Sequence, residues 1–329
     1  MTILFQDSRS AARARNRFRS ALLRWYDANK RDLPWRRTRD PFRIWVSEIM
    51  LQQTRVAAVL DHYRRFFQQF PTVAALAKAR EQHVLTAWSG LGYYRRARML
   101  HRAAKELAHD RRGRIPKTSA ELQELPGIGR YTAAAIASIA FQEPIAVVDG
   151  NVERVLSRIS GKQLGAGAYW EQAQALLDPE RPGDFNQAMM ELGATLCLPH
   201  APLCESCPIA RHCSAQGHLP TTKLRAPQNR AHRYLALVRR KNAILLKQRS
   251  RSESVMPGLW DLPERTEPEL PPILLLKHSI MNTYYEVRVY GTGPPAQIPG
   301  ARWISLSRLG SIPLTGMSRK ILRALNLLQ

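Results

Sequence analysis

The stretch Leu122–Val155 reads LQELPGIGRYTAAAIASIAFQEPIAVVDGNVERV. It contains a Pro-Gly-Ile-Gly turn that starts at Pro126, flanked by two segments with helical patterns. Pro126 ends the first helix, because proline lacks an N–H and disfavours helical geometry in the residue before it. Gly127 and Gly129 allow a positive φ and the close approach of another backbone. Asp149 follows, immediately before a third helical segment. The stretch therefore predicts a tight helical corner followed by a carboxylate at a helix start.

The residues around the turn indicate what the corner can bind. Thr118 and Glu121 form a capping box that starts the helix before the turn, and the helix after it begins near Arg130. The first N–H groups of that second helix have no partners within the helix and point outward beside Gly127 and Gly129. The turn is thus suited to bind one phosphate. An ordinary corner between two helices is the alternative explanation.

Composition limits the class of protein. The 329 residues suffice for two domains, and 50 Lys and Arg against 26 Asp and Glu give a net charge of +24. A balance this basic favours an acidic polymer as partner, first of all nucleic acid, although a merely soluble basic protein is the alternative. No run of 18 apolar residues and no signal-peptide core occur. We expect a cytoplasmic protein without a membrane partner.

Glu48 is the unusual residue of the next segment. Asp40 and Pro41 form a cap and a first-turn proline that open a helix, in which Glu48 stands among Trp45 and Ile49. A carboxyl in apolar surroundings has its pKa raised by desolvation. These residues alone leave two explanations open, a surface glutamate on one helical face and a carboxyl that holds its proton.

Asp149 has the opposite context. It precedes a helix with an apolar stripe over residues 152–159, where the helix dipole and free N–H groups favour a carboxylate. We expect these hydrogen bonds to lower its pKa and keep it ionised. A purely structural N-cap is the alternative, and the two roles are compatible.

The cysteines indicate a local metal centre. Cys197, Cys204, Cys207 and Cys213 are the four cysteines of the chain, with the spacing Cys-x6-Cys-x2-Cys-x5-Cys. Four thiolates within one short loop can close on one metal centre. Zinc is the chemical alternative, because a tetrahedral set of four sulfurs suits both.

The texture of the chain changes towards its end. Residues 9–19 are arginine-rich and are expected to form a solvated or frayed start. A polar segment with two prolines, 218–230, predicts an interdomain linker. After it, alternating patterns predict strands at Tyr234–Val238, Ala243–Gln248 and Tyr284–Tyr290. A helical first domain and a smaller α+β second domain are therefore expected.

Four motifs carry a family resemblance. The string Leu-Pro-Gly-Ile-Gly-Arg-Tyr-Thr-Ala resembles the helix-hairpin-helix of the endonuclease III superfamily, and the Glu48 helix resembles that of MutY-type adenine DNA glycosylases. The cysteine spacing is similar to the [4Fe-4S] loop of both groups, and Leu-Trp-Asp-Leu-Pro at 259–263 resembles the Nudix-like C-terminal domain of MutY proteins. The resemblance implies an all-α glycosylase domain over residues 1–217 with an iron–sulfur loop at 197–213, the linker, and a Nudix-like 8-oxoguanine recognition domain over residues 231–329.

This resemblance implies base excision repair. The expected substrate is double-stranded DNA with adenine mispaired with 8-oxoguanine or guanine, and the enzyme would flip adenine out and hydrolyse its N-glycosidic bond. Tyr131 stands where relatives with lyase activity carry a lysine, which favours hydrolysis alone. A nucleoid-associated monomer is expected. The alternatives are a thymine- or uracil-mismatch glycosylase and a non-catalytic iron–sulfur DNA-binding sensor.

The resemblance also assigns residues. Glu48 would protonate adenine, Asp149 would stabilise the sugar cation or bond to it, and Tyr131 and Asn151 would support this pair. Residues implied to line the adenine pocket or to contact DNA at the flipped base are Arg31, Trp35, Leu51, Gln53, Thr54, Tyr93 and Glu191.

The 8-oxoguanine reader departs from the family pattern. The family loop has the form His-x-Phe-Ser-His, whereas this chain has His278-Ser279-Ile280-Met281-Asn282. Met281 takes the place of the serine and Asn282 that of the second histidine. A thioether accepts hydrogen bonds only weakly, whereas an amide carbonyl accepts them well. We therefore expect Asn282 to read the base.

Overall fold

The computed structural model describes residues 8–215, 228–267, 269–292 and 298–328. The chain divides into two compact units, and each is made of two stretches of sequence. Unit 1 comprises Met1–Gln53 and Glu106–Lys223, and unit 2 comprises Thr54–Lys105 and Leu224–Gln329. The predicted domain boundary at residue 217 stays a prediction. No helix in the described ranges is both long and apolar enough to cross a membrane.

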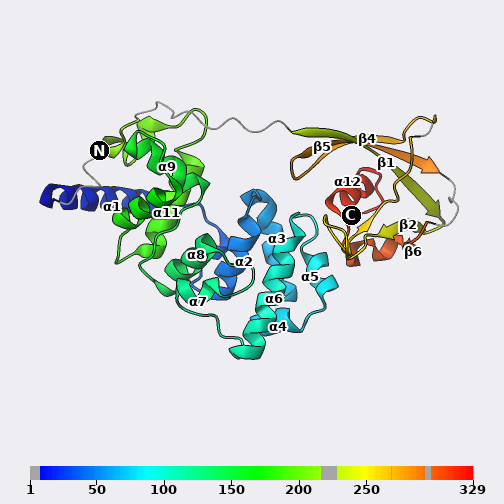
Figure 1. Ribbon diagram of the computed structural model, residues 1–329, viewed down its shortest axis with the longest axis horizontal. Coiled ribbons are helices and arrows are strands. Elements are labelled where there is room, and N and C mark those ends of the chain that lie inside the picture. The colour runs from blue at the N-terminus through cyan, green and yellow to red at the C-terminus, as the bar shows by residue number, and fades with distance from the viewer. Residues whose placement is uncertain (1–7, 216–227, 268, 293–297, 329) are drawn as a thin grey trace. The chain divides into compact units, whose positions relative to one another are not determined.

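Unit 1 is helical. Within it α11 packs against α1, α8 and α9, and α2 packs against α8 (Figure 1). Its elements are α1 (Arg9–Asn29), η2 (Pro34–Arg36), α2 (Pro41–Leu51), α7 (Ser119–Gln123), α8 (Arg130–Phe141), α9 (Gly150–Ser160), α10 (Ala166–Leu176), α11 (Pro182–Thr195), η3 (Cys204–Ser206) and η4 (Ala210–His212).

Side-chain caps start several of these helices where the sequence predicts them. Asp40 accepts hydrogen bonds from the N–H groups of Phe42 and Arg43, and Thr118 accepts one from Glu121. The apolar stripes of α1, α9, α10 and α11 then meet in one core, which includes Phe18, Leu22, Leu156, Phe185 and Leu192. Caps thus set the helix starts, and burial of the stripes fixes how the helices pack.

The arginine-rich start at residues 9–19 is helical rather than frayed, and its arginines are exposed or half-buried, as expected for a solvated segment. Helix α1 begins at Arg9, and the Ser8 side chain caps it by accepting from the N–H of Ala11. Ala11 and Ala14 are buried, whereas Arg9, Arg13 and Arg17 are exposed, so this part of α1 is amphipathic.

Unit 2 combines helices with a sheet. The helices from its first stretch are α3 (Val56–Gln69), α4 (Val73–Lys78), α5 (Glu81–Ala87) and α6 (Tyr94–Asp110), whose end reaches into unit 1. Its second stretch contains β1 (Asn229–Arg240), β2 (Ala243–Gln248), β3 (Trp260–Asp261), β4 (Leu274–Ile280), β5 (Thr283–Thr292), β6 (Ala301–Ser305), η5 (Leu306–Ser311) and α12 (Gly316–Ala324).

The strands form a mixed sheet in the order β3-β2-β1-β5-β4, with β6 also paired to β2. Strands β1 and β5 run parallel in register from Asn229 opposite Thr283, and the other pairs are antiparallel. Buried side chains of β1, β2 and β5 pack with η5 and α12 in a second core.

The predicted strands are present, and β1 and β5 are longer than expected. Strand β1 takes Asn229 and Arg230 from the predicted linker, of which residues 218–227 lie outside the described residues. The pattern did not indicate β4 as a strand, because its residues Leu-Leu-Leu-Lys-His-Ser-Ile do not alternate regularly between apolar and polar. The chain thus has helical glycosylase elements followed by a part that contains a sheet, as the predicted fold class requires.

Candidate functional site

The turn of the opening stretch lies between α7 and α8. Gly127 has φ +77°, in the left-handed region that favours glycine. Gly129 is the N-cap of α8 and has no side chain to cover the first N–H groups of that helix. A Cβ at Gly129 would meet nothing within 4 Å, so the space beside these N–H groups is open. The geometry fits the predicted phosphate site.

Glu48 and Tyr131 form a buried pair. Glu48 is 6% exposed on α2, and the Tyr131 hydroxyl at the start of α8 donates to its Oε2 at 2.8 Å. Met190 Sδ lies 3.4 Å from the same hydroxyl. Burial raises the pKa of Glu48 to about 7, helped by the charge of Asp149 and opposed by the hydrogen bond from Tyr131. Glu48 is therefore a carboxylic acid that can hold a proton near neutral pH.

Asp149 is the N-cap of α9. Its Oδ1 accepts from the N–H of Val152 at 2.8 Å, and its Oδ2 accepts from the Asn151 side chain at 3.0 Å. These bonds lower its pKa as expected, but the predicted net lowering was wrong, because burial raises the pKa by more. Unlike Glu48, this carboxyl receives several N–H donors that favour the ionised form.

Glu191 is held by two arginines. This carboxylate on α11 is 1% exposed and accepts from Arg31 Nε at 2.8 Å, Arg31 Nη2 at 2.6 Å and Arg36 Nη2 at 2.7 Å. Burial by itself would raise the pKa of Glu191, but the two guanidinium groups lower it to about 2. The structure thus brings two predicted pocket residues together in an ion pair.

The other residues predicted near the adenine have distinct environments. Trp35 is buried on η2 and Leu51 is half-buried at the end of α2. Gln53 is exposed with φ +55°, and Tyr93 is 48% exposed with φ +46°. Left-handed backbone at a residue other than glycine is strained, and such residues concentrate at functional sites.

Arg96 contacts Thr54 and the loop that carries Tyr93, two of the residues predicted to contact DNA. Its Nη2 donates to Thr54 Oγ1 at 3.1 Å and to the Leu91 carbonyl at 3.3 Å, and its guanidinium lies 5.3 Å from the centre of the Tyr93 ring. This arginine therefore links Thr54 to the segment that carries Tyr93.

Met281 and Asn282 form the tip of the β4–β5 hairpin. Ile280 pairs with Thr283, so the two residues make a two-residue turn, and both are exposed. Met281 is 75% exposed with φ +52°, a position that usually favours glycine. The tip presents the thioether and the amide to solvent.

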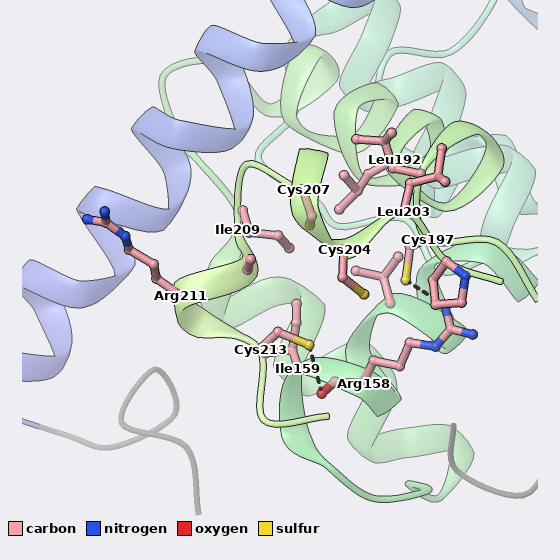
Figure 2. Close-up of a pocket in the computed structure, with 14 residues that line it drawn as sticks. Arg158, Ile159, Leu192, Cys197, Leu203, Cys204, Cys207, Ile209, Arg211 and Cys213 are labelled. Atoms are coloured by element: carbon pink, nitrogen blue, oxygen red, sulfur yellow. Dashed lines mark hydrogen bonds between the residues drawn. The ribbon is translucent and has the colours of Figure 1, made fainter. Parts of the chain in front are cut away.

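The four cysteines line one apolar cavity of about 290 Å³ (Figure 2). All four are free and half-buried. Arg158 Nη1 donates to Cys197 Sγ at 3.0 Å, and Cys213 Sγ donates to the Arg158 carbonyl at 3.3 Å. Burial raises the pKa of Cys207 to about 11, and the other three cysteines add to this rise.

These thiols surround a space and do not meet at one point. Among the described residues, no group of three or more His, Cys, Asp or Glu side chains is placed to share one metal ion. A single zinc needs four sulfurs at about 2.3 Å from one centre. The donor set of four soft thiols around one cavity fits a larger iron–sulfur group, and Arg158 offers a positive charge to the thiolates that such a group requires.

Sequence reasoning missed several arginines that organise these sites. Arg154 on α9 donates to Asn151 Oδ1 at 2.8 Å, to the Gly193 carbonyl at 2.7 Å and to the Cys197 carbonyl at 2.8 Å. It thereby connects the support of Asp149 to the first cysteine. Its position three residues after Asn151, one helical turn along α9, was the available signal.

Comparison with known proteins gives one family match. Residues 46–164 match the model of the HhH-GPD superfamily base excision DNA repair proteins. An adenine DNA glycosylase of Rattus norvegicus is 49% identical over 226 residues, covering 64% of this chain and 43% of the relative. An adenine DNA glycosylase of Buchnera aphidicola subsp. Baizongia pistaciae is 33% identical over 255 residues, covering 74% of this chain and 71% of the relative. The chain thus spans less than half of the rat relative.

Solved structures are similar to the helical part. A thermostable thymine-DNA glycosylase is 32% identical with a TM-score of 0.59, and the match covers 63% of this chain and 98% of that one. An endonuclease III trapped on DNA is 24% identical with a TM-score of 0.54, covering 63% of this chain and 96% of the other. The latter likeness concerns the fold alone.

Proposed function

Since this chain belongs to the MutY-type adenine DNA glycosylases of the helix-hairpin-helix superfamily, we propose that it releases adenine mispaired with 8-oxoguanine or guanine in duplex DNA. The observation that carries the proposal is Glu48, a buried carboxyl with a pKa of about 7 beside the Tyr131 hydroxyl. An N-glycosidic bond to adenine breaks easily only when the base is protonated. A neutral carboxylic acid inside a glycosylase fold supplies that proton.

The first step is proton transfer. Glu48 delivers its proton to N7 of the extruded adenine, and the C1′–N9 bond then breaks with its electron pair going to the base. Tyr131 keeps the Glu48 carboxyl in one orientation through the bond to Oε2. Since a phenol cannot form the Schiff base that a lysine forms, the product is an abasic site with an intact strand.

The sugar is left with a positive charge at C1′. Asp149, ionised, stabilises this cation or bonds to it covalently, and water then completes the hydrolysis. Val152 N–H and Asn151 orient the carboxylate by one bond to each oxygen. Arg154 fixes the Asn151 amide through its carbonyl oxygen, so that the amide N–H faces Asp149.

The residues predicted from the sequence are also the ones proposed to line the adenine pocket and to contact DNA. Glu191 with its arginines, Trp35 and Leu51 line the adenine pocket, and Gly127 and Gly129 bind one phosphate through the N–H groups of α8. Gln53, Thr54 and Tyr93 fill the space that the adenine leaves. The exposed, strained Tyr93 is suited to this role, because its ring can stack on bases.

The sheet-containing part is proposed to be a Nudix-like domain that reads 8-oxoguanine. That base differs from guanine by an N–H at N7, so its reader must accept a hydrogen bond. The Asn282 carboxamide at the exposed hairpin tip offers a carbonyl acceptor, which the thioether of Met281 offers only weakly. Asn282 is therefore the proposed reader.

The cysteine loop is proposed to hold a [4Fe-4S] cluster with a structural role. Cys197, Cys204, Cys207 and Cys213 would supply its thiolate ligands around the cavity in Figure 2. Metal analysis of protein purified without oxygen should find about four iron atoms per chain. Stoichiometric zinc without iron would contradict this proposal.

A single-turnover assay tests the function. Duplexes with A:8-oxoguanine, A:G and T:G pairs separate adenine release from the thymine-mismatch activity that the thymine-DNA glycosylase likeness favours. Glu48→Gln and Asp149→Asn should each lose most adenine release while DNA binding persists. Glu153→Gln is the matched control, because Glu153 is exposed on α9. Near wild-type rates in either variant would refute the proposed chemistry.

A further inference from the structure

The loop Ser89–Tyr93 has an unusual backbone. Gly90, Gly92 and Tyr93 have φ values of +111°, +72° and +46°, so that three of its five residues are in the left-handed half of φ space. A Cβ at Gly90 would lie 3.0 Å from His62 Nε2, a tight contact, and the φ of +111° would strain any other residue. Tyr93 pays a conformational penalty that glycine would not. A strained loop keeps such a shape only when its surroundings over-determine it.

Part of the restraint comes from the neighbouring helices. The His62 ring nitrogen Nε2 donates to the Ser89 carbonyl at 3.1 Å, and Trp88 Nε1 donates to the Gly92 carbonyl at 3.2 Å. Arg96 adds its bonds to the Leu91 and Gly92 carbonyls. These contacts hold the loop against α3 and α6, which carry the donors His62 and Arg96.

The rest of the restraint comes from the C-terminal segment 314–319. Within unit 2, the Leu314 carbonyl accepts from Ser89 Oγ at 3.0 Å and from the Tyr94 hydroxyl at 2.8 Å. Arg319 Nε, on α12, donates to Ser89 Oγ at 3.1 Å. Ser89, Tyr94 and Leu314 are all buried, so water cannot easily replace these bonds.

These two residues bracket the loop. Ser89 begins it and Tyr94 follows its last residue, so the Leu314 carbonyl binds both ends of the turn that projects Tyr93. We propose that Arg319 and the Leu314 carbonyl are positioning groups, which hold the Ser89–Tyr93 loop in its strained form and make base extrusion depend on the C-terminal segment. This inference rests on the proposed function in assigning Tyr93 to the space left by the adenine.

The test measures base extrusion separately from chemistry. All proteins carry Asp149→Asn, and 2-aminopurine replaces the target adenine opposite 8-oxoguanine, so that its fluorescence reports unstacking. Arg319→Ala should lower the extrusion equilibrium about tenfold, which corresponds to about 1.4 kcal/mol, the net size of one hydrogen bond. Tyr94→Phe, which removes the bond to Leu314, should act in the same direction. Arg319→Lys should retain part of the base extrusion that Arg319→Ala loses, because lysine keeps a hydrogen-bond donor and the positive charge.

Arg323→Ala is the matched control. Arg323 is exposed one turn further along α12. Its replacement with alanine removes the same charge from the same helix. Thermal unfolding of each variant separates a global loss of stability from a local effect, and fluorescence is measured well below the lowest midpoint. Equal extrusion in the Arg319→Ala, Tyr94→Phe and parent proteins would overturn the inference. If Arg319→Ala and Tyr94→Phe lower extrusion but the wild type releases no adenine, the proposed function is contradicted while this inference is supported.

Discussion

Replacing Glu48 with glutamine should stabilise the protein at alkaline pH, although it removes the proposed acid. Burial raises the pKa of Glu48 from 4.5 to about 7. Each pKa unit corresponds to 1.36 kcal/mol, so the folded protein pays about 3 kcal/mol to ionise this carboxyl. Between pH 4.5 and about 7 the native state keeps a proton that the unfolded chain releases. The contribution of Glu48 to the free energy of unfolding is therefore fully present below pH 4.5, falls through this window and is constant above it.

Glutamine does not titrate and can still accept the hydrogen bond from Tyr131. Relative to the wild type, the free energy of unfolding of Glu48→Gln should therefore rise by about 3 kcal/mol between about pH 4.5 and pH 8. Urea unfolding of the holoprotein at several pH values in that range measures this change. The test lies in the pH dependence of the difference, because a constant offset reflects packing alone.

Glu153→Gln is the control, because it removes a carboxyl that is exposed on α9 rather than buried. Asp149 is present in both the wild type and this control, so its titration contributes to the stability of both proteins. If the advantage of Glu48→Gln grows by less than about 1 kcal/mol across the window, burial of the ionised form is not what sets the pKa of Glu48.

Three further outcomes are expected. Tyr131→Phe removes the one hydrogen bond that lowers the pKa of Glu48, so the fall of the single-turnover rate on the alkaline side should move to higher pH; an unmoved limb would contradict this. Gly193→Ala places a Cβ 2.6 Å from that of Asn151, and should cost about 1–3 kcal/mol of stability by overpacking and slow adenine release, as unfolding and rate measurements would test. Asn282→Ala should reduce the preference for A:8-oxoguanine over A:G by about 5- to 100-fold, since one base-edge contact is worth about 1–3 kcal/mol; if the preference persists, the hairpin tip is not the reader.

Local chemistry explains which features could be predicted from the sequence. Proline, glycine and capping residues act within a few positions, so the starts of α2, α7 and α8 were predictable. The apolar neighbours of Glu48 allowed its burial but equally allowed a surface position, and the family resemblance decided between them. Strand β4 could not be predicted, because its residues show no regular alternation and its extended form depends on pairing with the distant strand β5.

Long-range partners were out of reach for the same reason. Glu191 lies 160 residues from Arg31 and 155 from Arg36, and no local pattern indicates which arginine a distant carboxylate will meet. The net rise in the pKa of Asp149 was missed because it depends on how deeply neighbouring helices bury the N-cap. The helix start revealed the hydrogen bonds to this carboxylate but not the burial that outweighs them.

The hydrogen-bond and charge partners of three carboxyls in unit 1, Glu48, Asp149 and Glu191, explain why their pKa values differ. Glu48 and Glu191 are buried and Asp149 is half-buried, and burial alone raises the pKa of all three. Glu191 meets two guanidinium groups and its pKa falls to about 2, so it is a permanent anion that holds Arg31 and Arg36 in place. Asp149 meets a backbone N–H and an amide, which oppose the rise but do not cancel it. Glu48 accepts one hydrogen bond from a phenol and is also near the charge of Arg36, but burial outweighs both and its pKa reaches about 7. The donors that each carboxyl receives thus order the three from structural anion to sugar-stabilising carboxylate to proton donor. Adding a cation beside Glu48 should therefore lower its pKa and leave the carboxyl ionised, so that it could no longer donate a proton.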